Sequence, residues 1–187
     1  CPAGPEELKR HLHWIEPGGS ALVPGLGVER GEVPDVMRGE EVQIFGAMRL
    51  TGMTDGLFVL PGTHSKWATL SGGRVTGFRT CMTGEFYGLL SQHSILSRTL
   101  DAGAPLDEAT FMRGVTRASE GNGLLHDAFG VRALALFDRL SPVQSAMTPG
   151  LRASSALMLK TIFIRSEPMS AIFVKMPPAM RSAAAPS

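Results

Sequence analysis

The spacing of apolar residues between positions 57 and 80 predicts β-strands. Residues 56–62, GLFVLPG, form a continuous apolar run that ends in a Pro-Gly break, whereas SKWATL and VTGFRT alternate apolar and polar positions. A continuous run is typical of a strand buried on both faces, and alternation is typical of a strand with one exposed face. The turn SGGR lies between the two alternating segments. The pattern therefore predicts successive hairpin strands over residues 57–80.

Helical spacing is found on both sides of these strands. A short apolar run at 20–28 is broken by Pro24 and two glycines, which predicts a strand entering a turn. Strands followed by helices favour a mixed α/β fold. Helices are expected over residues 5–13, 36–50 with Asp35 as N-cap, 85–96 capped by Thr83, 107–120, and 124–140 with Leu124, Leu125, Ala128, Val131, Leu134 and Leu140 on one face.

The character of the chain changes after Pro142. The segment that follows holds five of the ten methionines, its apolar runs have no clean period, and its last residues, PPAMRSAAAPS, are of low complexity. We expect residues 146–187 to be an atypical tail that is disordered or translated from a shifted frame.

Composition narrows the classes of function. The 187 residues are 43% hydrophobic, enough for a core, and the net charge of +1 gives no broad field that would attract nucleic acid or anionic lipid. Any anion site is therefore local. Two cysteines, Cys1 and Cys81, are too few for a disulfide framework, and no apolar run is long enough to span a membrane. We expect a cytoplasmic protein without nucleic-acid or membrane partners, and a start at Cys1 favours a chain that begins within a longer protein.

The segment PGTHSKW, residues 61–67, is the first candidate site. A Gly-Thr turn between strands can direct backbone N–H groups at a phosphate, while the hydroxyls of Thr63 and Ser65 add donors and Lys66 adds a positive charge. The alternative is an ordinary turn in which Trp67 packs inward and Lys66 is solvated.

The segment PDVMRGEEVQIFG, residues 34–46, is the second candidate. It gathers Asp35, Glu40 and Glu41 around Arg38 at an expected helix start. A carboxylate there is stabilised in its ionised form and can accept a proton from a substrate hydroxyl or bind it, and Arg38 could hold a substrate carboxylate. The alternative is that these residues only cap the helix and complement its dipole.

Other polar residues carry weaker signals. Thr80, Thr83 and Glu85 could line a cleft where a strand meets a helix, and Cys81 between them is expected to be a small core residue. The five histidines lack zinc-ligand spacing, so no metal site is expected. P-loop and Rossmann signatures are absent from the sequence.

Three blocks in order, PDVMRGEEVQIFGA, LPGTHSKWA and TCMTGEFYGLLSQHSIL, resemble the 2-dehydro-3-deoxygalactonokinase family. The similarity extends over most of residues 1–142. It implies an actin-like, ribonuclease H-like kinase fold and ATP-dependent phosphorylation of the 6-hydroxyl of 2-dehydro-3-deoxy-D-galactonate in galactonate catabolism, with Mg²⁺ bound alongside the nucleotide.

The resemblance also implies roles for residues. The hairpin GTHSKW is similar to the second phosphate loop of these kinases, which implies that Gly62, Thr63, His64, Ser65 and Lys66 face the phosphates of ATP. The helix start resembles the place of the catalytic base, for which Glu40 is the first choice and Asp35 the second. Arg38 suits the sugar-acid carboxylate, with Glu41 as a further substrate-binding residue.

The family's pattern is matched only in its middle. An Asp-Gly-Thr type first phosphate loop and the adenosine-binding glycine-rich segment are absent from this sequence. We therefore expect residues 1–52 to end a first kinase lobe, residues 53–145 to form part of a second, and this chain to be inactive alone. Two rival hypotheses are a non-catalytic phosphate or sugar-acid binding module and an inactive product of a degraded gene.

Overall fold

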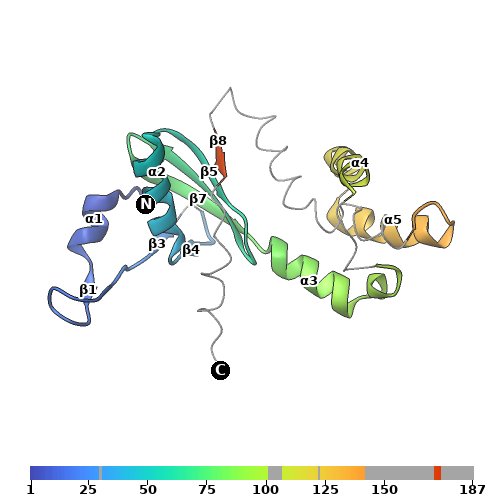
Figure 1. Cartoon of the computed structure of the whole chain (residues 1–187), viewed down its shortest axis with the longest axis horizontal. Coiled ribbons are helices and arrows are strands. Elements are labelled where there is room, and N and C mark those ends of the chain that lie inside the picture. Colours follow the sequence, from blue (N-terminus) through green and yellow to red (C-terminus); the bar gives the residue numbers. More distant parts are fainter. Residues whose placement is uncertain (30, 101–106, 122, 142–170, 174–187) are drawn as a thin grey trace. The chain divides into compact units, whose positions relative to one another are not determined.

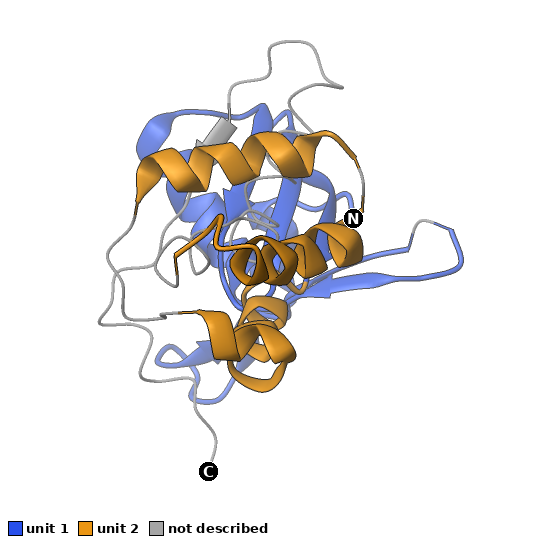
Figure 2. Ribbon diagram, turned by 90° about the vertical axis from the view of Figure 1, so that its right-hand side faces the viewer, with its two compact units in different colours: residues 1–81, 169–187 blue, residues 82–168 orange. Residues whose placement is uncertain are grey.

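The computed structural model describes residues 1–29, 31–100, 107–121, 123–141 and 171–173. The chain divides into two compact units, coloured separately in Figure 2: unit 1 contains residues 1–81 and 169–187, and unit 2 contains residues 82–168. This division follows Cys81, whereas the expected lobe boundary follows residue 52. The assignment of residues 1–52 and 53–145 to kinase lobes stays a prediction.

Unit 1 is built on a four-stranded sheet with the strand order β7-β6-β5-β8 (Figure 1). Its strands are β5 (Gly56–Leu60), β6 (Ser65–Ser71), β7 (Arg74–Cys81) and β8 (Ala171–Phe173). The first three pair antiparallel in sequence order, which confirms the predicted hairpins, and β8 pairs parallel with β5. Strand β8 lies within the expected tail. The remainder of 146–187 is outside the described residues, so the expectation for the tail stays a prediction.

One face of this sheet forms the main core with helix α2 (Glu40–Thr51). Because side chains alternate along a strand, Phe58 and Leu60 on β5 share a face with Ala68 and Leu70 on β6, and all four pack in one buried cluster with Ile44 of α2. Phe58 and Ile44 are completely buried. Removing a large buried side chain of this kind typically costs about 3–5 kcal/mol. The core therefore fixes α2 against the sheet.

The expected helix over residues 36–50 is wrong at its start. Asp35–Met37 is a strand, β4, that pairs antiparallel with β3 (Leu26–Val28), and Met37 is buried opposite Leu26. The chain then passes through Gly39, whose φ of +105° lies in the region that favours glycine, before α2 begins at Glu40. The N-cap of α2 is thus Gly39, not Asp35.

The N-terminal elements match the sequence pattern in part. Helix α1 (Pro5–Arg10) confirms the first part of the expected helix, but His13–Trp14 forms strand β1 and pairs with β2 (Ala21–Leu22). The strand expected over 20–28 is interrupted at Pro24 and Gly25 and becomes β2 and β3. Among the residues that the structure describes, no helix is long and apolar enough to span a membrane.

Unit 2 is helical in its described part. It contains α3 (Thr83–His93), the 3₁₀-helix η1 (Ile95–Thr99), α4 (Glu108–Ser119) and α5 (Leu124–Leu136). Thr83 is the first residue of α3 and not its cap, which is Met82. Asp107 caps α4 by accepting hydrogen bonds from the N–H groups of Ala109 and Thr110.

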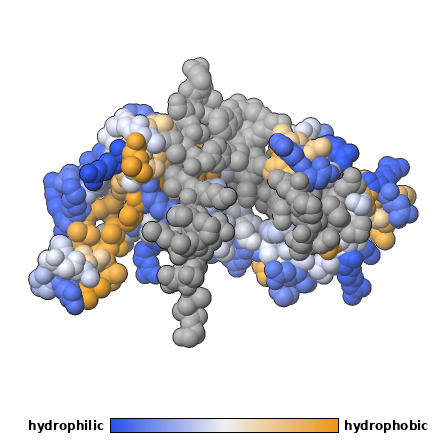
Figure 3. All heavy atoms as spheres, viewed as in Figure 1, coloured by the Kyte–Doolittle hydropathy of each residue, from blue (hydrophilic) through white to orange (hydrophobic). Residues whose placement is uncertain are grey.

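The expected apolar face of α5 is only partly correct. Ala128 and Val131 are buried, but Leu125 is 77% exposed and Leu124 is exposed as well. Helix α5 has apolar residues on more than one side, so the sequence pattern alone does not select its buried face. Hydrophobic surface over the α5 end of unit 2 is visible in Figure 3.

Candidate functional site

A pocket of about 600 Å³ lies in unit 1, between the β3–β4 hairpin, the start of α2 and strand β6. Its charged lining residues are Arg38, Glu40 and Lys66, three of the residues singled out in the sequence. One wall is backbone-rich because it contains Gly25 and Gly27. Gly25 has a φ of +78°, and a Cβ at this position would lie 2.6 Å from the carbonyl oxygen of Met37. This wall therefore requires glycine.

Lys66 is a buried strand residue, with only 6% of its surface exposed. Its ammonium group donates hydrogen bonds to the carbonyl oxygen of Val36 (2.7 Å) and to Oγ1 of Thr80 (2.8 Å). The alternative of a solvated Lys66 is wrong, because this side chain continues the row of Leu70 and Ala68 on the core face of β6. The alternative of an inward-packed Trp67 is confirmed, since Trp67 is 3% exposed.

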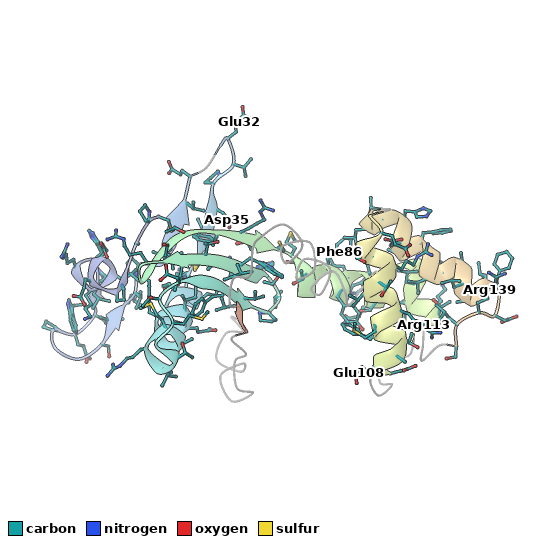
Figure 4. All side chains as sticks on the ribbon, turned by 90° about the horizontal axis from the view of Figure 1, so that it is seen from above. Glu32, Asp35, Phe86, Glu108, Arg113 and Arg139 are labelled. Carbon is teal, nitrogen blue, oxygen red and sulfur yellow. The ribbon has the colours of Figure 1, made fainter. Side chains whose placement is uncertain are left out.

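Asp35 lies where the β3–β4 hairpin meets the sheet, as Figure 4 shows. Its carboxylate accepts three hydrogen bonds: from the N–H of Val36 (2.8 Å), from the N–H of Thr80 (2.6 Å) and from the Thr80 hydroxyl (2.5 Å). Asp35 thereby links β4 to β7. It is not among the residues that line the pocket.

Glu40 and Glu41 occupy different environments although they are adjacent. Glu40, the first residue of α2, is partly exposed, lines the pocket and accepts a hydrogen bond from the N–H of Arg38 (3.1 Å). Its position places the carboxylate near the positive end of the helix dipole. The side chain of Arg38 is exposed at the same pocket.

Glu41 points into the protein and is completely buried. Its Oε2 accepts a hydrogen bond from the N–H of Gly39 (2.6 Å), while Oε1 has no hydrogen-bond partner among the described residues. Burial raises the pKa of Glu41 above its usual value, and the nearby N–H groups of Glu41 and Gly39 oppose this shift. Glu41 does not line the pocket, so the geometry does not favour it as a substrate ligand.

The predicted phosphate loop is divided between two environments. Gly62, Thr63 and His64 are exposed in the turn between β5 and β6 and do not line the pocket. Ser65 and Lys66 belong to β6 and are buried, and the hydroxyl of Ser65 donates to the carbonyl oxygen of Cys81 (3.4 Å). The structure therefore brings Lys66 together with Arg38 and Glu40 but not with the rest of the turn.

The remaining candidates add little to this site. Cys81 is half-buried, and burial raises the pKa of its thiol, with Arg79 opposing the shift and Asp35 adding to it. Thr83 and Glu85 belong to unit 2. Within the described ranges, no group of three His, Cys, Asp or Glu side chains is placed to hold a metal ion.

Comparison with known proteins identifies the family. The sequence profile of 2-keto-3-deoxy-galactonokinase matches residues 1–151. The chain belongs to this family. The resemblance in the three sequence blocks is thereby confirmed, since 2-keto and 2-dehydro are two names for the same group.

Individual relatives agree with this family. The chain is 42% identical over 119 residues to the "Probable 2-dehydro-3-deoxygalactonokinase DgoK1" of Rhizobium meliloti (strain 1021), which covers 60% of this chain and 38% of that protein. It is 39% identical over 115 residues to the 2-dehydro-3-deoxygalactonokinase of Escherichia coli (strain K12), over 60% of this chain and 37% of that protein. The chain thus matches under two fifths of either curated relative.

A solved structure is similar as well. It is described as a "putative 2-dehydro-3-deoxygalactonokinase protein" from Sinorhizobium meliloti, with a TM-score of 0.76, 31% sequence identity, and coverage of 92% of this chain and 59% of that one. The mixed α/β fold predicted from the sequence agrees with this likeness.

Two parts of the site were missed by the sequence analysis. The wall formed by residues 24–27 gave only a turn signal, although its two glycines beside an apolar strand could have suggested a close backbone approach. Thr80 was noted as a cleft residue, but its bonds to Asp35 and Lys66 depend on strand register. Both features become visible only when the β3–β4 hairpin is placed against the sheet.

Proposed function

We propose that the protein acts in the ATP-dependent phosphorylation of 2-dehydro-3-deoxy-D-galactonate at its 6-hydroxyl. The observation that carries this proposal is the pocket in which Glu40 meets Arg38 and Lys66, in a chain of the 2-keto-3-deoxy-galactonokinase family. One carboxylate and two cations suit a substrate that carries hydroxyl groups and a carboxylate. The proposal includes the actin-like, ribonuclease H-like fold, of which the sheet carrying α2 would be part.

Glu40 is the proposed general base. Its carboxylate accepts the proton of the 6-hydroxyl as the hydroxyl oxygen attacks the γ-phosphorus of ATP, and the bond to the β-phosphate oxygen breaks to release ADP. Asp35 is a poorer choice because its carboxylate already accepts three hydrogen bonds and lies outside the pocket lining. Arg38 offers a planar group that can bind the sugar-acid carboxylate.

The nucleotide is proposed to approach the exposed turn. Gly62, Thr63 and His64 offer backbone and side-chain groups to its phosphates at that turn. Mg²⁺ enters as part of the MgATP substrate, which agrees with the way this ion usually keeps water and phosphate ligands.

The chain alone fits a more limited role. The whole pocket is formed by residues 24–66, whereas the chain matches less than two fifths of the curated relatives. We expect residues 1–187 to bind the sugar acid without hydrolysing ATP, as a non-catalytic binding module would. Saturable binding without ADP release is the expected result for this chain.

A hybrid enzyme tests the kinase proposal. The matching region of this chain replaces the corresponding region of the E. coli relative, and ADP release is followed with and without the sugar acid. We expect sugar-acid-dependent ADP release that Glu40→Gln lowers by about 100-fold or more, a typical loss for a general base. A hybrid that melts cooperatively, retains sugar-acid binding and releases no ADP would contradict the proposal.

A further inference from the structure

Lys66 is an unusual residue for its place, the buried second position of strand β6. Lysine is almost never fully buried without a charged partner, yet both groups that Lys66 contacts among the described residues are neutral, the Val36 carbonyl and the Thr80 hydroxyl. Keeping an ammonium group there costs desolvation energy that neutral acceptors only partly offset. A role in holding an anion would account for its place.

The hydrogen bonds at Thr80 have a fixed direction. An ammonium group can only donate, and an ionised carboxylate can only accept. The Thr80 hydroxyl therefore accepts from Lys66 (2.8 Å) and must donate its proton to Oδ1 of Asp35 (2.5 Å). Asp35 also holds the backbone of Thr80 through its Oδ2. The hydrogen bonds that join Lys66 to Thr80 and Thr80 to Asp35 thus set the position of the ammonium group.

The ammonium group so placed lies at the pocket. The Val36 carbonyl that it contacts belongs to a lining residue two positions before Arg38, and Lys66 itself lines the same pocket. Lysine has three donors, and the two contacts above use two of them. Among the described residues no partner takes the third donor, which a ligand could use at a pocket that Arg38 also lines.

We propose that Lys66 binds the carboxylate of the sugar acid together with Arg38, and that Thr80 and Asp35 are positioning residues for its ammonium group. This inference rests on the proposed function for the identity of the ligand. It moves Lys66 from the phosphate loop to the sugar-acid pocket and Asp35 from candidate base to support of the binding residue. It is carried by the buried contacts of Lys66 and by the pocket, neither of which involves the exposed turn.

Ligand binding to residues 1–187 tests the inference. Trp67 is adjacent to Lys66 and buried, whereas Trp14 is 51% exposed, so a Trp14→Phe background assigns the fluorescence to Trp67. Three probes are titrated: the sugar acid, its neutral amide and inorganic phosphate. The variants are Lys66→Met, Thr80→Val and Thr80→Ser. Thr76→Val is the control on the same strand, because Thr76, whose hydroxyl donates to the Thr69 carbonyl, does not line the pocket.

The expected result is a selective loss. Lys66→Met and Thr80→Val should weaken binding of the sugar acid by about tenfold or more, the size of a charge-assisted hydrogen bond, and leave the amide within about twofold of wild type. Thr80→Ser keeps the hydroxyl and should restore affinity, and Thr76→Val should change nothing. Thermal melts of each variant establish that it is folded.

Three outcomes overturn the inference. If Thr80→Val weakens acid and amide equally, Thr80 has only a structural role. If Lys66→Met reduces binding of inorganic phosphate but not of the sugar acid, Lys66 is a phosphate ligand. In both cases the kinase proposal stands, because the hybrid enzyme tests it separately. If the folded wild-type chain binds neither acid nor amide, the assignment of this pocket to the sugar acid fails together with the role of Lys66.

Discussion

Replacing Asp35 by alanine should destabilise unit 1 substantially. The substitution removes three hydrogen bonds, of which the two to Thr80 are partly buried and the one to the Val36 N–H is exposed. Water replaces the exposed bond at little cost, whereas each bond to a charged acceptor in a partly buried site is worth about 1.5 kcal/mol or more. The expected loss is therefore about 3 kcal/mol, a large part of the stability of a typical domain.

Urea denaturation followed by the fluorescence of buried Trp67 measures this loss. With an m-value of about 2 kcal/mol/M, the midpoint should fall by about 1.5 M. Glu32→Ala is the matched control, because Glu32 is exposed on the same β3–β4 hairpin and points away from the sheet (Figure 4). Its midpoint should stay within about 0.2 M of wild type.

A double-mutant cycle with Thr80→Val separates the shared interaction. Because the Asp35 carboxylate and the Thr80 hydroxyl are in direct contact, the two losses should not add, and a coupling energy of about 1 kcal/mol is expected. An Asp35→Ala midpoint equal to that of Glu32→Ala would refute this reasoning. Asp35 would then again be a candidate for a purely chemical role.

Three further predictions concern the same unit. Gly25→Ala should lower the melting temperature by several degrees, since its Cβ would meet the Met37 carbonyl, whereas Gly46→Ala in the open middle of α2 should raise it slightly. Because burial raises the pKa of Glu41 in the folded state, the wild-type protein should lose stability as pH rises above 4.5 and this carboxyl group ionises. Glu41→Gln has no such group, so its stability relative to wild type should increase over the same pH range. The Gly72 N–H and the hydroxyls of Thr54 and Ser71 lower the pKa of Asp55, so its ionised carboxylate stabilises the wild-type protein at neutral pH. Wild type loses this stabilisation as pH falls below 3.8. Asp55→Asn should lack it, and so should be less stable than wild type at neutral pH.

Chemical denaturation across pH checks both carboxyl predictions. For Glu41, a stability difference between wild type and variant that does not change between pH 4 and pH 7 would contradict the assignment. For Asp55, the assignment would be contradicted if wild type and Asp55→Asn lost stability in parallel below pH 4. Gly25→Ala with an unchanged melting temperature would show that this wall can accept a side chain.

The strands of the sheet were predictable because their patterns are local. The continuous run of β5 is explained by burial on both faces, and the alternation in β7 by more complete burial of one face, whereas β6 is buried on both faces from Ser65 to Ala68 and alternates only after that. The start of α2 was not predictable from spacing alone. Val36 and Met37 fit a helical stripe equally well, and only pairing with β3 and the left-handed Gly39 select the strand.

The site depended on a register that the sequence does not display. The turn pairs Ser71 with Arg74, and a regular hairpin would then place Lys66 opposite Arg79. A register shift between Thr69 and Leu70 places it opposite Thr80 instead. Because a shift of one residue exchanges the two faces of a strand, this irregularity decides which side chain the ammonium group meets.

Candidate residues were therefore easier to find than their partners. Arg38, Glu40 and Lys66 were selected by residue type and line one pocket, but Lys66 was grouped with the phosphate loop, whose residues Gly62, Thr63 and His64 do not line that pocket. The resemblance implied a base at Glu40 and a substrate-binding residue at Glu41, but the sequence did not show which of the two side chains is buried. Only the direction of each side chain from the first turn of α2 separates the pocket residue from the buried one.

A crystal structure of the chain with 2-dehydro-3-deoxy-D-galactonate would test the central claim most directly. The account predicts that the sugar acid occupies the pocket with its carboxylate hydrogen-bonded to Arg38 and Lys66 and its 6-hydroxyl within about 3.2 Å of the Glu40 carboxylate. Sugar acid bound outside this pocket, or bound inside it with the 6-hydroxyl directed away from Glu40, would contradict the account.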